Sequence, residues 1–255
     1  MYSILYVPDQ FHVYHLLCVR CGAGIYRILR SKSATQAGHT RKRRKNKTKK
    51  MKTLIEEKLN YTVLALIVLA VFYGIYFGKM LAQKRQGIRT HQIGRRKEKE
   101  LHTVETLMSI ATFGTPVAQL LSIILGWNHL PAGARFTGFL VGMVGDLVFL
   151  LSVLCMKDSW RAGIPDKDKT RLVTSGIYKF SRNPAFLGFD LMYIGVLLLY
   201  GNLLTVGFSV FAIVMLHLQI LQEERYLEAT FGEEYAIYKK QVFRYLGRKQ
   251  KKNAK

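Results

Sequence analysis

The chain has 255 residues, of which 49% are hydrophobic, and its 39 Lys and Arg against 16 Asp and Glu give a net charge of +23. Such a charge suits nucleic acid or an anionic membrane surface, but the charged and apolar residues occupy separate parts of the chain. The basic residues cluster at 41–52, 79–99, 157–182 and 239–255, with long apolar runs between them. This segregation indicates an all-α, polytopic integral membrane protein in a lipid bilayer and argues against a nucleic-acid partner.

Five apolar runs have the composition of membrane helices, for which about 20 residues are needed, with a range of about 17–25. We expect spans at 59–78, 104–126, 136–156, 185–200 and 203–221. The fourth is short, and only Gly201 and Asn202 separate it from the fifth, so the two are predicted to form a tight helical hairpin. Gly138, Gly142 and Gly145 give the third span a small-residue face for close helix packing.

The Lys and Arg residues near the span ends predict the orientation. They follow spans one, three and five, which places these segments in the cytoplasm. Five spans then put the N-terminus outside, although the basic block at 41–50 resists translocation. We therefore expect the natural chain to begin at Met51, with residues 1–50 an upstream extension. The alternative is a genuine cytosolic basic tail with one span miscounted.

These features divide the chain into five segments. They are a basic N-terminal extension at 1–50, the first span and its basic cytosolic loop at 51–103, the second and third spans at 104–156, a core containing the hairpin at 157–247, and a basic tail at 248–255. Cys18 and Cys21 form a lone CxxC pair with no second pair, so neither a metal site nor a disulfide is predicted.

Arg182, Asn183 and Pro184 directly precede the apolar part of the fourth span. Asn before Pro is a helix-start signal, because Asn can cap free backbone N–H groups and Pro fits the first helical position. Arg182 beside that helix terminus makes a candidate anion site, although its side chain could instead reach a lipid phosphate. Asp190, less than two turns further on, could line the same pocket as an ionisable group at membrane depth. Asp146 is expected to hydrogen-bond a neighbouring span.

The segment 216–246 carries the second group of polar residues, with His217 near the end of the fifth span and Glu223 and Glu224 at its edge. The simplest interpretation is an amphipathic helix that leaves the membrane with its acids in water. Phe231-Gly232 is expected to end this helix and a surface helix to follow it. The apolar face of that surface helix would carry Tyr235, Tyr238, Val242 and Tyr245.

Taken together, TSGIYKFSRNPAFLG, a helical hairpin and EERYLEATFGEEYAIYKKQVFRYL resemble the isoprenylcysteine carboxyl methyltransferase family, which is related to the phospholipid N-methyltransferases. The likeness covers roughly residues 155–247, including SWRAGI at 159–164, and consists of three separated blocks in the family's order and spacing. The family often has His where Asn183 stands, so an imidazole role at this position is not expected.

The resemblance implies a membrane-embedded methyltransferase whose core, residues 157–247, holds S-adenosyl-L-methionine at the cytosolic face. Arg182 or the N-terminus of the fourth span would bind the carboxylate of this cofactor, and Glu223 or Glu224 its ammonium and sulfonium groups. Carried over by position, the residues that form the cofactor site would be Tyr178, Arg182, Asn183, Pro184, Gly188, His217, Glu223 and Glu224.

The methyl acceptor implied by the resemblance is lipophilic, such as a protein's C-terminal S-isoprenylcysteine carboxylate or a related small molecule, and could enter from the bilayer. A carboxylate acceptor needs no general base, and Arg244, with Arg161 as second choice, is the candidate for orienting it. An amine acceptor, as on a phospholipid headgroup, must lose a proton, so His217 or a Glu becomes the candidate base. A non-enzymatic membrane protein whose basic loops recruit anionic lipid is a third interpretation.

Overall fold

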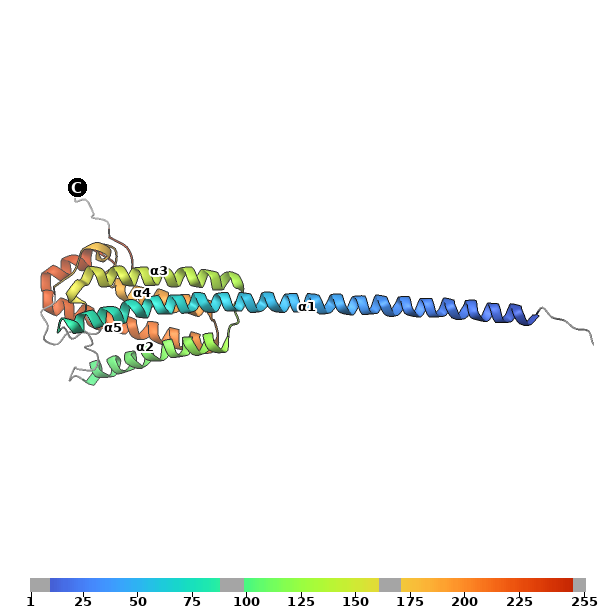
Figure 1. The fold of residues 1–255 in the computed structure, drawn as a ribbon. Helices are drawn as coiled ribbons and strands as arrows, with labels where there is room; N and C mark the ends of the chain where they lie inside the picture. Colours follow the sequence, from blue (N-terminus) through green and yellow to red (C-terminus); the bar gives the residue numbers. More distant parts are fainter. Residues whose placement is uncertain (1–9, 88–98, 161–170, 250–255) are drawn as a thin grey trace, which may run out of the picture. The chain divides into compact units, whose positions relative to one another are not determined.

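The structure is a computed structural model that describes residues 10–87, 99–160 and 171–249. Residues 1–57 and 58–255 form two compact units, and all contacts discussed below lie in the second. The α-helices are α1 (Gln10–Arg85), α2 (Lys99–Leu125), α3 (Ala132–Met156), α4 (Pro184–Leu199) and α5 (Leu203–Gln241), with short 3-10 helices η1 (Lys157–Ser159) and η2 (Gly176–Lys179) (Figure 1). The predicted all-α fold is confirmed.

Among the residues that the structure describes, four helical segments are long and apolar enough to cross a membrane, namely Asn46–Arg85, Thr103–Leu125, Ala132–Ser159 and Leu203–Gln241. They correspond to four of the five predicted spans, although the second ends one residue earlier than predicted, and the chain is a multi-pass integral membrane protein. The remaining predicted span corresponds to α4, an apolar helix of 16 residues. At 1.5 Å per residue, α4 is about 24 Å long, which is less than the roughly 30 Å of a bilayer's hydrocarbon core.

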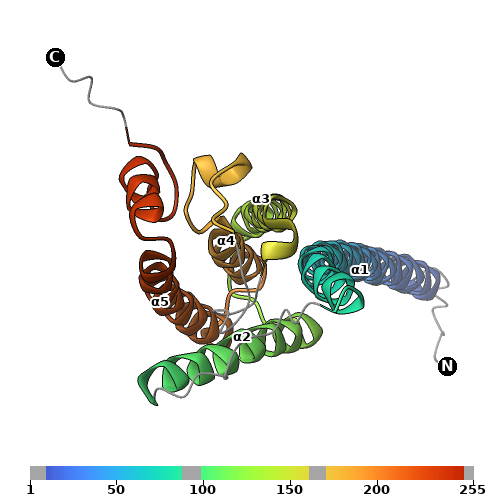
Figure 2. The same ribbon diagram turned by 90° about the vertical axis from the view of Figure 1, so that its left-hand side faces the viewer.

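Helix α4 lies between α3 and α5 (Figure 2). Its side chains are buried on several faces, and Met192, Tyr193, Val196 and Leu199 are each 0% exposed. A helix that is apolar all round is expected where other helices enclose it. The shortness of α4 is therefore compatible with the membrane, because protein surrounds much of its surface.

Glycines allow α3 and α4 to approach closely. A Cβ atom on Gly195 would lie 2.5 Å from the Cα of Gly142, and one on Gly145 would lie 2.7 Å from the backbone N of Met192. These neighbours are backbone atoms, so no side-chain rotation could relieve the clash. The predicted small-residue face of the third span is confirmed: α4 is its partner at Gly138 and Gly145, while a Cβ on Gly142 would meet Val68 of α1.

The turn that joins α4 to α5 is short and well bonded, as predicted for the hairpin. Asn202 Oδ1 accepts a hydrogen bond from the Thr205 N–H at 3.0 Å, and Thr205 Oγ1 accepts one from the Asn202 N–H at 3.1 Å, which together form a capping box. At the same end of α4, Arg135 donates from Nε to the Leu199 carbonyl at 3.0 Å, and its guanidinium lies 4.0 Å from the Tyr61 ring centroid.

Candidate functional site

The turn before α4 begins the helix as predicted but uses its asparagine differently. Pro184 occupies the first turn, and Asn183 stands at the N-cap position without a capping hydrogen bond from its side chain. Instead, Asn183 Nδ2 donates to Glu224 Oε1 at 3.3 Å and to the Arg244 carbonyl at 3.2 Å. The capping role predicted for Asn183 is wrong, because partners from the distant C-terminal region take up its amide group.

Glu224 of α5 is the centre of the polar cluster beside this turn. Its Oε1 lies 3.0 Å from Arg182 Nη2, and Arg244 donates from Nε to Oε1 at 3.1 Å and from Nη2 to Oε2 at 2.9 Å. The side chains of Arg182 and Glu224 are 7% and 5% exposed, whereas that of Arg244 is 34% exposed. The hydrogen bonds from Arg244 to the Glu224 carboxylate raise the pKa of Arg244, so this guanidinium stays charged.

Residues 242–249, here called the C-terminal strap, follow α5 and run beside the turn before α4. The backbone N–H groups of Arg182 and Asn183 donate to the carbonyls of Phe243 and Arg244 at 3.1 and 3.2 Å. Val242 and Tyr245 were predicted to lie on a surface helix. This prediction is wrong, because α5 ends at Gln241. The predicted interruption before that helix is confirmed, since the backbone inside α5 leaves the helical conformation at Gly232.

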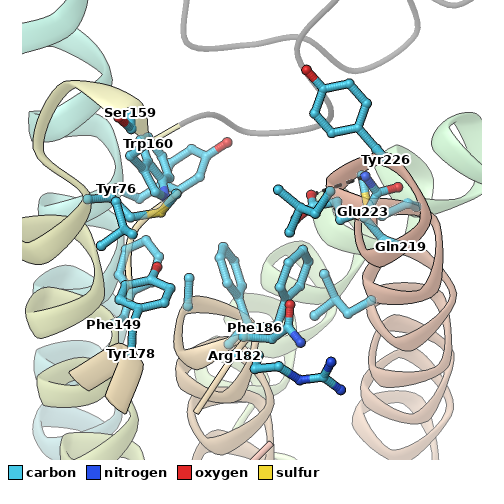
Figure 3. A pocket seen from close by; sticks show the side chains of 18 of the residues that line it. Tyr76, Phe149, Ser159, Trp160, Tyr178, Arg182, Phe186, Gln219, Glu223 and Tyr226 are labelled. Carbon is cyan, nitrogen blue, oxygen red and sulfur yellow. Dashed lines mark hydrogen bonds between the residues drawn. The ribbon is translucent and has the colours of Figure 1, made fainter. Parts of the chain in front are cut away.

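A cavity of about 580 Å³ lies next to the turn, between α1, α2, α3, α4 and α5. Tyr76, Phe149 and Trp160 stand on one side of it, while Glu223 and Tyr226 from α5 stand on the other (Figure 3). Its volume is in the range of small-molecule sites, and its lining is mainly apolar with a few polar groups. The cavity is therefore a candidate ligand site.

The residues predicted to bind a cofactor divide into two groups in the structure. Those that line the cavity are Tyr178, Arg182, Asn183 and Glu223. Those that are not among its lining residues are Pro184, Gly188, His217 and Glu224. Arg244, predicted to orient an acceptor, contacts Glu224 rather than the cavity, and Arg161 lies outside the described residues.

Two members of the second group have other neighbours. Gly188 lies at the crossing with α3, where an added Cβ would be 2.8 Å from the Cβ of Phe149 and 3.0 Å from the carbonyl oxygen of Gly145. His217 Nδ1 lies 2.6 Å from the hydroxyl of Tyr245 in the C-terminal strap. Gly188 thus serves helix packing, and His217 contacts the strap.

The aromatic walls are the part of the site that the sequence analysis missed. Tyr76, Phe149 and Trp160 line the cavity, and Tyr76 meets Trp160 edge to face with ring centroids 5.7 Å apart. Phe149 also stacks at 4.6 Å on Phe72, which is not itself a lining residue. Trp160 lies within the SWRAGI block, so the resemblance had marked the position but not its role. Aromatic residues in apolar helices give no sequence signal that separates a cavity wall from ordinary core.

The two intramembrane aspartates do not join this site. Asp190 is not among the residues that line the cavity, so the prediction that it shares a pocket with Arg182 is wrong. Among the described residues, neither carboxylate oxygen of Asp146 has a hydrogen-bond partner, which contradicts the expected bond to a neighbouring span.

Arg182 offers unused donors beside the cavity. Its Nη2 is occupied by Glu224, but its Nε and Nη1 are buried without a hydrogen-bond partner in the described part of the chain. Buried donors are normally paired, and an unpaired one in a native fold calls for an explanation such as a missing ligand. Glu223, whose Oε1 accepts from Gln219 Nε2 at 3.3 Å, supplies an acidic group to the same cavity (Figure 3). A zwitterion with a carboxylate and a cationic centre would complement these two groups.

Comparisons with known proteins find relatives among membrane methyltransferases. The family described as phospholipid methyltransferase matches residues 136–234. A protein-S-isoprenylcysteine O-methyltransferase of Schizosaccharomyces pombe is 39% identical over 72 residues, covering 28% of this chain and 30% of that protein. A probable protein-S-isoprenylcysteine O-methyltransferase of Oryza sativa subsp. indica is 28% identical over 110 residues, covering 42% of this chain and 58% of that protein.

The chain is related to the isoprenylcysteine carboxyl methyltransferase family. It spans 30% and 58% of the lengths of these two relatives, so it matches only part of each. An uncharacterized protein of Haemophilus influenzae is 41% identical over 63 residues, which is 22% of this chain and 100% of that protein. The matched family range, 136–234, includes most of α3, all of α4, and α5 from its start to residue 234. It therefore contains much of the polar cluster and of the cavity lining.

Proposed function

We propose that this chain is a membrane-embedded methyltransferase that binds S-adenosyl-L-methionine in the cavity and methylates a lipophilic acceptor, as the isoprenylcysteine carboxyl methyltransferases do. The observation that carries the proposal is the buried Arg182, whose Nε and Nη1 have no partner among the described residues and which lines a cavity that also contains Glu223. This pair fits the two charged ends of the cofactor's amino-acid part.

The residues divide the work as follows. Arg182 would bind the cofactor's carboxylate, and Glu223 its ammonium or sulfonium group. The aromatic walls, including Phe149 and Trp160, would exclude water. The bound cofactor supplies an electrophilic methyl group on sulfur. An acceptor carboxylate needs no general base, so the site has to orient the acceptor and keep the site dry.

The acceptor is proposed to be lipophilic because the cavity reaches the outer surface of the helices. Phe77 of α1 and Phe113 of α2 line it, and they are 55% and 75% exposed. On a membrane protein such side chains face lipid, so a long apolar chain could lie there. We place the site at the cytoplasmic face, following the distribution of Lys and Arg near the span ends.

A phospholipid headgroup is the second candidate acceptor, favoured by the match to the phospholipid methyltransferase family. Methylation of an amine releases a proton, and His217 is not among the residues that line the cavity. Glu223, which does line it, is then the candidate base. Measured methyl transfer to an isoprenylcysteine carboxylate and to a phospholipid amine would decide between the two acceptors.

The first test is calorimetric titration of S-adenosylmethionine and S-adenosylhomocysteine into the detergent-solubilised protein. We expect micromolar binding by wild type, at least tenfold weaker binding by Arg182→Ala, and about tenfold weaker binding by Glu223→Gln, because each removes a charged contact worth about 1.5–3 kcal/mol. Arg225→Ala is the matched control, since Arg225 is exposed and absent from the cavity lining.

Transfer of a radioactive methyl group to an S-farnesylated cysteine derivative or to a phosphatidylethanolamine then separates the two acceptors. Absence of cofactor binding by the folded wild type would leave a non-enzymatic membrane protein as the remaining interpretation.

A further inference from the structure

His217 and Tyr245 form a contact that the proposed chemistry does not use. The His217 Nδ1 and Tyr245 hydroxyl atoms are 2.6 Å apart, and the two rings are stacked with their centroids at 5.9 Å and their planes at 16°. His217 belongs to α5 and Tyr245 to the C-terminal strap, so the contact joins the strap to a membrane helix. Neither residue lines the cavity.

The C-terminal strap is also bonded to the turn that carries Arg182. Besides the two bonds from the backbone N–H groups of Arg182 and Asn183, the Gly247 N–H donates to the Phe180 carbonyl at 2.7 Å. The strap closes on itself through the Phe243 N–H, which donates to the Gly247 carbonyl at 2.9 Å. A displacement of the strap would therefore release the backbone on both sides of Ser181.

The side chain of Arg244 extends this influence to the guanidinium of Arg182. Arg244 occupies Glu224 Oε2 through Nη2 and shares Oε1 through Nε, so Arg182 reaches the carboxylate only through its own Nη2. Without Arg244, Glu224 could form the two parallel bonds that a carboxylate prefers with a guanidinium. Arg182 would then lose donors that are available for a ligand.

We propose that the C-terminal strap is a positioning element for the cofactor site, fixed by the hydrogen bond between His217 and Tyr245. This inference rests on the proposed function, because the ligand concerned is the cofactor. The strap holds Arg244 against Glu224 and so keeps Arg182 Nε and Nη1 available for the ligand's carboxylate. His217 acts through the strap, as a positioning residue, and not as a cofactor ligand or a base.

The test compares S-adenosylhomocysteine binding by wild type, Tyr245→Phe, Arg182→Lys and the double variant. Tyr245→Phe keeps the ring and removes the hydroxyl, and loss of one hydrogen bond predicts about fivefold weaker binding. Arg182→Lys keeps a charge at the site but lacks the planar donor set that the strap protects. In that background we expect Tyr245→Phe to change the dissociation constant less than twofold, which a merely structural role would not produce.

Tyr61→Phe is the matched control, because it removes a tyrosine hydroxyl that donates to the Ala132 carbonyl at 3.0 Å, at the end of the bundle near Arg135. We expect unchanged binding in this variant. A second readout is hydrogen exchange of the Arg182 and Asn183 amides, which should become faster in Tyr245→Phe and stay unchanged in Tyr61→Phe.

The outcomes separate the two proposals. If wild type binds S-adenosylhomocysteine but Tyr245→Phe binds equally well, leaves amide exchange unchanged, or weakens binding equally in both Arg182 backgrounds, the strap inference is overturned and the proposed function stands. If the folded wild type does not bind this ligand, the proposed function fails and the strap inference fails with it.

Discussion

Polar side chains hold both ends of α4, but only at the C-terminal end does the described polar side chain find partners for both its donor and its acceptor. At the C-terminal end, Asn202 accepts from Thr205 through Oδ1 and donates through Nδ2 to the Trp127 carbonyl at 3.0 Å. At the N-terminal end, the Arg182 side chain is only 7% exposed, yet its Nε and Nη1 lack partners among the described residues. Burial of polar groups alone therefore does not mark a functional site. At the N-terminal end of α4, the buried donors without a partner also line a cavity, and the two observations together indicate a ligand site.

The largest expected effect is at the N-terminal end of α4, with Glu224→Gln. Removing the charge leaves Arg182 buried without its ion pair, which predicts a loss of about 3 kcal/mol in the free energy of unfolding. Binding of S-adenosylhomocysteine should weaken by at least tenfold because Arg182 is no longer held in place. Thermal unfolding in detergent and calorimetry measure the two quantities.

Glu228→Gln is the control for this variant, because Glu228 pairs with Lys239 where both side chains are more than 40% exposed (44% and 42%). An exposed pair contributes less than about 1 kcal/mol. Equal losses of stability in the two variants would contradict the central role assigned to Glu224.

An intermediate effect is expected at the C-terminal end, with Asn202→Ala. This change removes the helix cap of α5 and predicts a loss of about 1–2 kcal/mol in unfolding free energy. Because Asn202 is far along α4 from the cavity and absent from its lining, the dissociation constant for S-adenosylhomocysteine should stay within twofold of wild type. Binding weakened by more than twofold in Asn202→Ala would contradict the assignment of ligand binding to the N-terminal end of α4 alone.

The smallest loss of stability is expected for Tyr238→Phe, which also acts at the N-terminal end of α4. The Tyr238 hydroxyl donates to the Tyr178 carbonyl at 2.6 Å and so supports η2 from the far part of α5. Tyr238→Phe should lower the unfolding free energy by about 1 kcal/mol. A thermal shift assay with and without S-adenosylhomocysteine checks it, and we expect the ligand-induced stabilisation to be kept. Loss of that stabilisation would mean that the hydroxyl contributes to binding.

The positions of the apolar helices could be predicted from the sequence because apolar length and small-residue spacing are local signals. The hairpin around Gly201 and the interruption at Gly232 are cases of this kind. Features that depend on distant contacts did not follow. The amide of Asn183 is taken up by Glu224 and by the Arg244 carbonyl, which lie 41 and 61 residues away along the chain, so its local capping preference did not decide the outcome.

The two adjacent glutamates show the limit within a single helix. Successive residues of an α-helix project about 100° apart, so Glu223 and Glu224 cannot both face one cavity in the same way. The resemblance brought both to the site, but only the packing of α5 against its neighbours places Glu223 at the cavity and Glu224 between the two arginines. Tyr245 was misplaced for a related reason, since its position depends on where α5 ends.

The bend in α5 at Gly232 determines which residues the last part of this helix can contact. A straight helix of its 39 residues would be about 58 Å long, nearly twice the thickness of a bilayer's hydrocarbon core. At Gly232 the backbone adopts a φ of 49°, in the left-handed region that other residues seldom enter. Tyr238, beyond this bend, is thereby returned to contact the residues before α4. The conformation of Gly232 thus directs the last part of α5 back toward the turn before α4.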